Sequence, residues 1–188
     1  VTALPHQPEE SRAGVVEADH QLAVGHERAQ AGPGGGGARD AQGWGRFAGA
    51  GGMAVLSRLP IDTDQARDFS GLLWADLPGA SLPPGMDGAA RRVQRLATTG
   101  FWEVPLHLPG GGRLHLLAWH ATPPVFDGPE DRNGRRNHDE TAFWLRLLAG
   151  ELPMPPPEPP FVLLGQPNLD PQDGEGLPDA IRDLLARP

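Results

Sequence analysis

The fold is decided by residues 102–120, which read WEVPLHLPGGGRLHLLAWH. Over residues 102–108, apolar side chains alternate with polar ones or proline, which is the period of a strand with one apolar face. The Pro-Gly-Gly-Gly run at 109–112 predicts a turn. Residues 114–120 are apolar at odd and even positions, so this returning strand is expected to be covered on both sides. Pro105 has no backbone N–H, which predicts an edge or a bulge for the first strand.

Further elements are predicted on either side of this hairpin. Residues 53–61 form a short apolar run that contains a proline near its end, which is typical of a buried strand. After the hairpin, residues 121–136 are expected to form a polar loop. A helix is then predicted to begin at Asn137, with Glu140 completing a capping box. It is expected to end at Gly150, ahead of a proline-rich segment.

The C-terminal part adds one strand and one helix. Residues 161–164, Phe-Val-Leu-Leu, predict a short buried strand, and residues 181–185 carry the apolar face of a final amphipathic helix. The order is therefore strand, hairpin, helix, strand, helix. This order predicts an α/β layered fold with mixed strand directions.

The chain has 188 residues, enough for one domain of ordinary size. Its 26 glycines and 22 prolines are concentrated in particular stretches. Residues 1–40 are poor in apolar groups and end in a glycine run, so a mobile arm is expected there, with one short helix around 9–29. The partial folded domain is expected over residues 41–188, and no strand is predicted within 1–40.

Composition excludes several classes of function. The formal net charge is −8 and lysine is absent, which argues against broad electrostatic binding of nucleic acid but leaves a local arginine cluster for a small anion. Cysteine is absent, so disulfides, zinc–thiolate sites and thiol catalysis are excluded. No apolar run reaches 18 residues and no signal peptide is visible, so a soluble chain without a membrane span is expected. Compartment and oligomeric state stay open.

Three groups of residues are candidates for chemistry. His120 ends the second hairpin strand, residues 126–140 are rich in arginine and acids, and residues 165–171 follow the strand at 161–164. Functional side chains gather where strands end and loops begin in layered α/β proteins. We therefore expect His120 and Asn168 side by side at one end of a sheet, on neighbouring strands, with the 126–136 loop leaning over them.

These groups resemble the endonuclease/exonuclease/phosphatase superfamily. The segment 165–171, GQPNLDP, is similar to the Gly-Asp-x-Asn-x-Asp-Pro signature of that superfamily, with Gln166 in place of the first aspartate. Residues 114–120 resemble the strand that carries the family's histidine, and residues 122–140 resemble a loop of a bacterial branch. Residues 53–61, after Gly-Trp-Gly-Arg-Phe at 43–47, fit as well, so the likeness covers about residues 40–188.

The resemblance implies a four-layer α/β sandwich that hydrolyses phosphomonoesters or phosphodiesters with Mg²⁺, or with Mn²⁺ or Ca²⁺. It implies that His120 hydrogen-bonds or protonates around the phosphate, that Asn168 orients it and that Asp170 supports the metal site. Nucleic acid, phospholipid and sugar phosphate all stay open as substrates. The groups that would hold the substrate phosphate are Arg132, Arg135, Arg136 and His138.

Departures from the family pattern lead to competing hypotheses. Family members carry a metal-binding glutamate at the end of an early strand and an Asp-His pair after the last strand, and neither is found here. Gln166 cannot act as a base. The chain is thus expected to be an incomplete enzyme with very weak activity, or else a catalytically inactive relic or binding module. For Gln166 itself, a damaged motif and a branch that normally uses glutamine are both open.

Structural explanations compete with each functional one. Without the resemblance, His120 is a hydrogen-bonded structural histidine, and His107 and His115 are surface or packing residues without partners. The arginines of the loop then pair with its acidic residues. Asn137 and Glu140 are expected to act only as helix caps.

Overall fold

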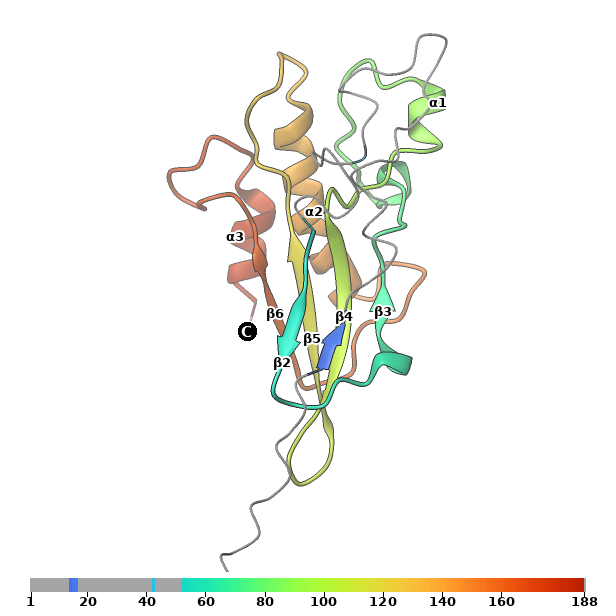
Figure 1. Ribbon diagram of the computed structural model, residues 1–188. Coiled ribbons are helices and arrows are strands. Elements are labelled where there is room, and N and C mark those ends of the chain that lie inside the picture. Colours follow the sequence, from blue (N-terminus) through green and yellow to red (C-terminus); the bar gives the residue numbers. More distant parts are fainter. Residues whose placement is uncertain (1–13, 17–41, 43–51, 188) are drawn as a thin grey trace, which may run out of the picture.

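Figure 1 shows the computed structural model, which describes residues 14–16, 42 and 52–187. Its main sheet has four strands in the order β3-β4-β5-β6, and a second sheet pairs β1 with β2. The strands are β1 Gly14–Val16, β2 Val55–Ser57, β3 Arg67–Asp68, β4 Gly100–His107, β5 Arg113–His120 and β6 Phe161–Gln166. The helices are η3 Thr63–Gln65, η4 Trp74–Asp76, α1 Gly88–Arg91, α2 Arg132–Leu148 and α3 Asp179–Leu185.

The predicted hairpin and the predicted mixture of strand directions are confirmed. β4 pairs with β5 antiparallel from Gly100 opposite His120 to His107 opposite Arg113. Gly110, Gly111 and Gly112 make the turn, each with a positive φ that favours glycine. β5 then pairs with β6 in parallel, and α2 lies between them in the chain, as a parallel crossover requires.

Pro105 lies inside the sheet, so the predicted edge or bulge is wrong. β4 has neighbours on both sides, and its pairing with β5 runs through Pro105 opposite His115 without interruption. On the other side the Pro105 carbonyl accepts the Asp62 amide at 2.9 Å. Proline is tolerated there because its neighbour on that side is the irregular segment before η3, so no regular ladder bond is lost.

The sheet is covered on both faces, as predicted for β5. One face packs against α2, and its buried core includes Phe101, Leu117 and Trp119 from the sheet with Phe143, Trp144 and Leu147 from the helix. On the opposite face Trp102, Val104 and Ala118 pack with Val55 of β2. Figure 1 accordingly shows α2 and the β1–β2 pair on opposite sides of the sheet. This layered arrangement of helices on a mixed sheet is the predicted α/β class.

Helix α2 begins earlier than predicted. It starts at Arg132, with Asp131 as a left-handed N-cap residue (φ 51°) whose side chain makes no capping hydrogen bond. Asn137 and Glu140 therefore lie inside the helix and are fully buried, so the predicted capping box is wrong. Their side chains bond to distant backbone groups, and this tertiary use outweighs the local capping pattern.

An early strand exists that the sequence did not reveal. β1 pairs antiparallel with β2, so the prediction of no strand within residues 1–40 is wrong. Three residues are too short to show a period, and their partner lies about 40 residues further along. The predicted strand at 53–61 is reduced to Val55–Ser57, with Leu56 75% exposed.

Two other expectations for the N-terminal part concern residues outside the described ones. The predicted mobile arm and the predicted short helix around 9–29 lie outside the described residues, except for Gly14–Val16, which form a strand. Glu17 is the next residue in the sequence after β1 and also lies outside the described residues. Among the described helices, none has the length and apolar character needed to cross a membrane.

Candidate functional site

The site is assembled at the carboxyl ends of β5 and β6. The parallel register places His120 opposite Gln166, so the predicted pairing of these two strands is confirmed. Residues paired in this way share a face of the sheet. The loops that follow the two strands, 121–131 and 167–178, leave from the same end, at the top of Figure 1. This end therefore gathers His120, Gln166 and Asn168.

His120 is half-buried at the end of β5. Within the described part of the chain its imidazole makes no hydrogen bond, unlike the structural histidine of the alternative explanation. Burial lowers the pKa of His120 below its ordinary value. The ring is therefore neutral at neutral pH, with one nitrogen able to donate a proton and the other able to accept one.

Asn168 is held by a short chain of amide hydrogen bonds. Its Nδ2 donates to the Ala121 carbonyl at 2.7 Å, and its Oδ1 accepts Gln166 Nε2 at 2.8 Å. Its backbone is left-handed (φ 53°), which asparagine tolerates better than most residues. The side chain of Asn168 thus links the end of β6 to the first residue after β5.

Asn137 of α2 bonds to the loops on which His120 and Asn168 border. It is fully buried in α2, and its Nδ2 donates at 2.7 Å to both the Thr122 carbonyl and the Pro167 carbonyl. These carbonyls belong to the loops after β5 and β6, so one amide group joins the two loops. The sequence suggested only a capping role, because both acceptors are backbone groups far away in the chain. Among the described residues, Asn137 Oδ1 has no hydrogen-bond partner.

Glu140 fixes the backbone on both sides of the hairpin. Its carboxylate accepts the Thr98 amide at 2.7 Å and the Thr122 amide at 2.5 Å, and its side chain is fully buried. Burial raises the pKa of Glu140, while Arg136 and the two amides act in the opposite direction. Glu140 therefore sets where the loop after β5 begins, and capping patterns gave no sign of this role.

The three predicted phosphate-binding arginines differ in exposure. Arg136 is 5% exposed and donates to the backbone carbonyls of Leu96, Arg95 and Gln42. Burial lowers its pKa to about 10, so it stays charged at neutral pH. Its guanidinium is enclosed by carbonyl groups, and a phosphate contact would have to displace them.

Arg132 and Arg135 are half-exposed in the first turn of α2. Arg132 Nη2 donates to Gln94 Oε1 at 2.6 Å, and Arg135 Nε donates to the Glu130 carbonyl at 3.2 Å. Each bond uses part of a guanidinium that has five N–H donors. Arg132 takes part in a further interaction besides this bond, and the predicted role of both arginines stays a prediction.

His138 is not brought together with the other predicted groups. Its Nδ1 lies 2.8 Å from Asp139 Oδ1, and Asp139 is fixed in turn by the Trp74 indole and the Ser81 amide, both at 2.6 Å. His138 lines a groove of about 470 Å³ between α2 and α3. Across the described residues, no hydrogen bond joins it to His120 or Asn168.

Asp170 is exposed and ionised. Its Oδ1 accepts the amides of Gln172 (2.7 Å) and Asp173 (3.0 Å), which lower its pKa. Mg²⁺, Mn²⁺ and Ca²⁺ require several oxygen ligands. Within residues 14–16, 42 and 52–187, no three His, Asp or Glu side chains converge as a metal site. The described residues therefore do not make up the predicted metal site by themselves.

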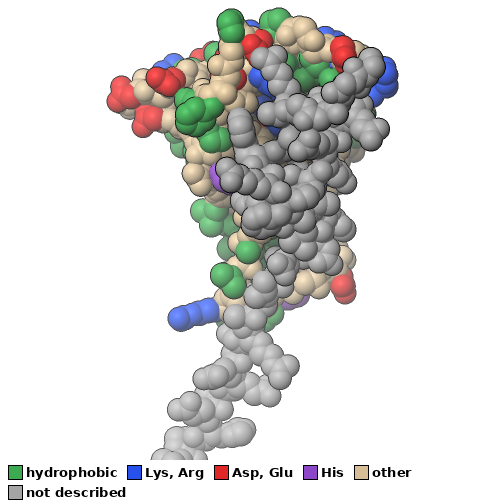
Figure 2. Space-filling model, turned by 45° about the horizontal axis from the view of Figure 1, so that its top comes forward, with side chains coloured by type: hydrophobic (Ala, Val, Ile, Leu, Met, Phe, Trp, Pro, Cys, Tyr) green, Lys and Arg blue, Asp and Glu red, His purple; other side chains and the backbone are tan. Residues whose placement is uncertain are grey.

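The surface near the site has no single sign of charge. On the face shown in Figure 2, outside the grey atoms, arginine side chains stand apart among acidic, apolar and uncharged ones. Such a surface does not resemble the continuous basic stripe of proteins that grip a nucleic-acid backbone.

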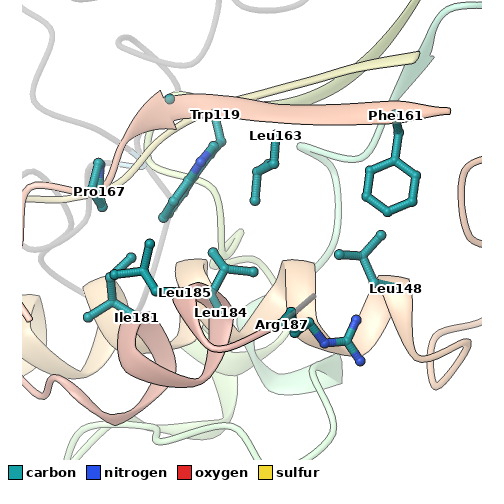
Figure 3. Close-up of a pocket in the computed structure, with 10 residues that line it drawn as sticks. Trp119, Leu148, Phe161, Leu163, Pro167, Ile181, Leu184, Leu185 and Arg187 are labelled. Carbon is teal, nitrogen blue, oxygen red and sulfur yellow. The ribbon is translucent and has the colours of Figure 1, made fainter. Parts of the chain in front are cut away.

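An apolar groove of about 600 Å³ lies beneath the site, between β6 and the helices. Figure 3 shows Trp119 and Leu163 pointing from the sheet toward Ile181 and Leu184 of α3. The predicted apolar face of the last helix is thus confirmed. The groove is lined mainly by apolar side chains, with Arg187 also among its lining residues, which suits packing more than phosphate chemistry.

Comparison with known proteins gave one family and one structure. The model of the Endonuclease/Exonuclease/phosphatase family matches residues 13–186. The crystal structure of sphingomyelinase C from Streptomyces griseocarneus is similar, with 18% identity over 74% of this chain and a TM-score of 0.42. This chain spans 38% of that protein's length. A comparison with curated proteins gave no match.

Proposed function

This chain belongs to the endonuclease/exonuclease/phosphatase family, and from that premise we propose that it is a divalent-metal-dependent phosphoesterase domain. The reaction would take place where β5 and β6 end. The observation that carries the proposal is the parallel register, which sets His120 opposite Gln166 while Asn168 bonds to Ala121. His120 and the segment that resembles the family signature thus lie at the ends of two neighbouring strands.

His120 is proposed as the group that exchanges a proton or hydrogen bond with the phosphate ester. A neutral imidazole can accept a proton or donate one, and its lowered pKa keeps it in that form at neutral pH. Its freedom from other hydrogen bonds among the described residues leaves both nitrogens for substrate. Asn168 is proposed to orient the phosphate next to it.

Charge on the phosphate is proposed to be offset by Arg132 and Arg135. Both lie in the first turn of α2, whose N-terminal end also attracts anions. Arg136 is left out of this role, since its guanidinium is already bonded to three carbonyls.

The metal ligands are proposed to include a residue outside the described part. The family places a metal-binding glutamate after an early strand, and Glu17 follows β1 in this sequence. We assign that role to Glu17 on the resemblance, with Asp170 as a supporting carboxylate. Substitution Glu17→Gln should abolish stimulation by Mg²⁺, whereas Glu158→Gln, at an exposed position, should leave it unchanged.

Phosphodiesters or phosphomonoesters are the proposed substrate class. The net charge of −8 disfavours long nucleic-acid substrates and is compatible with a small phosphate ester or a phospholipid headgroup. The second candidate function is a binding module without turnover. It is favoured by Gln166, which cannot take a proton, and by the incomplete set of metal ligands among the described residues.

Hydrolysis of bis(p-nitrophenyl) phosphate and p-nitrophenyl phosphate tests the proposal, with Mg²⁺, Mn²⁺ or Ca²⁺ and with EDTA. The chain alone should turn over far below the roughly 10 per second of an ordinary enzyme. His120→Ala should remove the metal-dependent rate. His107→Ala is the matched control, because His107 lies at the opposite end of the hairpin and is 48% exposed.

Three outcomes are distinguishable. Equal metal-dependent rates for the wild type and His120→Ala would refute the proposed site. No turnover, together with His120-dependent binding of phenyl phosphate, would favour the binding module. Turnover near 10 per second would show that the chain is not catalytically incomplete.

A further inference from the structure

The side-chain amide of Asn168 has only one orientation that satisfies its surroundings. On one side it faces the Ala121 carbonyl, with 2.7 Å between Asn168 Nδ2 and the carbonyl oxygen. A backbone carbonyl oxygen can only accept a hydrogen bond. The nitrogen of the Asn168 amide must therefore point toward Ala121. The oxygen and nitrogen of an amide are otherwise hard to distinguish, but here a backbone group decides between them.

This orientation determines what residue 166 must supply. The oxygen of the Asn168 amide then faces residue 166, and Gln166 Nε2 lies 2.8 Å from it. The contact requires a donor at position 166. Glutamine provides an N–H, whereas an ionised aspartate or glutamate provides only acceptors. Gln166 is exposed, so a carboxylate at this position would either repel the oxygen of Asn168 or turn into the solvent, and that oxygen would then lose its donor from residue 166.

The backbone around this chain of bonds has little freedom to adjust. The Ala121 amide donates to the Gln166 carbonyl at 2.9 Å, which continues the β5–β6 ladder past His120. A methyl group added at Gly165 would lie against the carbonyl and indole of Trp119, closer than van der Waals contact allows. Asn137 holds the Pro167 carbonyl on the next residue. The backbone of residue 166 is thus held on both sides relative to Ala121.

We propose that Gln166 is a positioning residue that donates a hydrogen bond to Asn168 and thereby holds its amide nitrogen against Ala121, so that a donor is favoured over a carboxylate at this position in this chain. The damaged-motif hypothesis is then unnecessary. The consequence for catalysis rests on the proposed function: residue 166 takes no proton, and His120, its neighbour in register, is the titratable group at the strand ends. The hydrogen-bond polarity itself does not depend on any activity.

A carboxyl group placed at position 166 measures this polarity directly. Gln166→Glu keeps the length of the side chain, and ¹³C NMR can follow the ionisation of the new carboxyl in the full chain. The measurement is made in a His120→Gln background, because His120 lies opposite residue 166 and its protonated imidazole would itself lower the pKa of the new carboxyl. In that background the pKa should be raised, since only the protonated carboxyl can donate to Asn168 Oδ1. The matched control is Gln65→Glu, at an exposed position that follows Asp62 and Asp64 in the chain, so that ordinary repulsion between carboxylates is included in the control.

A pKa in the Gln166→Glu chain that is above the control's supports the proposal. An equal pKa overturns it, because it means that the Asn168 oxygen does not require a donor. A pKa below the control's also overturns it, because it means that Asn168 has turned its nitrogen toward the carboxylate. Loss of the Asn168 side-chain N–H signal from its position in the wild-type spectrum would accompany that rotation.

Hydrolysis of bis(p-nitrophenyl) phosphate tests the catalytic consequence separately. Gln166→Asp restores the residue type of the family signature, yet it should lower kcat about 10-fold or more through a misplaced Asn168. An increase in kcat would overturn the positioning role. No hydrolysis by the wild type would count against the proposed function and leave the pKa measurement as the test of polarity.

Discussion

Glu103 and Glu140 are both almost fully buried, at 2% and 0% exposure, but their hydrogen-bond partners differ in kind. Glu103 lies in the middle of β4 and accepts from two side chains, Arg67 Nε at 2.8 Å and His115 Nδ1 at 2.5 Å. His115 therefore has a partner, and His107 Nε2 lies 3.6 Å from Asp62 Oδ2, so the expectation that these two histidines lack partners is wrong. Glu140 accepts instead from two backbone amides, one before β4 and one after β5.

The difference separates two tasks in the molecule. A carboxylate bonded to side chains ties together strands that the backbone ladder already holds, and those side chains can reorient when their partner changes. A carboxylate bonded to backbone amides fixes the path of the chain itself, and those amides have no other orientation available. Glu140 and Asn137 use α2 to fix the loops that carry the candidate site, so disruption there should cost more than disruption around Glu103.

Substitution of each glutamate by glutamine should give the largest contrast. Glu140→Gln places an NH₂ group against a backbone N–H, and a buried donor left without an acceptor costs about 3 kcal/mol. Glu103→Gln still accepts from Arg67 and can donate to a neutral His115, so its loss should be about 1 kcal/mol. Urea unfolding followed by tryptophan fluorescence measures both. Equal losses would contradict the distinction between backbone and side-chain partners.

Asn137→Leu should have the next largest effect. The two loop carbonyls at Thr122 and Pro167 lose their donor in the interior, which should lower the free energy of unfolding by about 2 kcal/mol. If Asn137 also positions the site, kcat for a phosphodiester falls while KM changes little. Thr141→Val is the control, since among the described residues its hydroxyl bonds only within α2, at 3.1 Å to the Asn137 carbonyl. A similar loss of kcat in the control would refute the positioning role.

Gly165→Ala should have a smaller effect, confined to the packing of β6 on β5. The added methyl group meets Trp119 on both its backbone and its ring, and overpacking of this kind costs about 1–2 kcal/mol. Gly71→Ala is the matched control, because no atom of the described residues lies within 4 Å of the added methyl group there. Thermal unfolding of the two variants should separate them, and equal melting temperatures would show that Trp119 moves aside freely.

The features that the sequence predicted are those carried by local patterns. The hairpin at β4 and β5 follows from a period of two and a glycine turn, and β6 follows from a short apolar run after prolines. The predicted burial of β6 is wrong, because β6 is an edge strand of the described sheet whose Phe161 and Leu164 are exposed. His120, Gln166 and Asn168 were located because strand ends collect functional side chains. Neighbouring strands in a parallel pair then brought them to one end of the sheet.

The features that the sequence did not reveal depend on partners far away in the chain. Asn137 mimics a helix cap locally, but its acceptors lie 15 and 30 residues away. Arg136 belongs to an arginine-rich run typical of phosphate binding, yet its carbonyl partners at Leu96 and Gln42 are 40 and 94 residues away. β1 becomes a strand only through β2. No local pattern records any of these contacts.

The smallest expected effect is the pH dependence that His120 contributes to stability. Unlike Glu103 and Glu140, this half-buried side chain has no hydrogen-bond partner among the described residues. Its folded-state pKa is lowered by burial, so the unfolded chain binds a proton more readily than the folded one. The stability associated with neutral His120 is therefore present above the ordinary histidine pKa of about 6.5 and is lost as pH falls below it.

His120→Gln removes this titration and leaves every other group in place. Urea unfolding at several pH values between 7.5 and 5.5, in buffers free of phosphate and sulfate, should show the wild type losing stability relative to His120→Gln as the pH falls. The difference should stay below about 1 kcal/mol, because His120 is only half-buried. His107→Gln serves as the control for removing a histidine from the opposite end of the hairpin. Parallel pH curves for the wild type and His120→Gln would mean that burial does not lower the pKa of His120 in the folded chain.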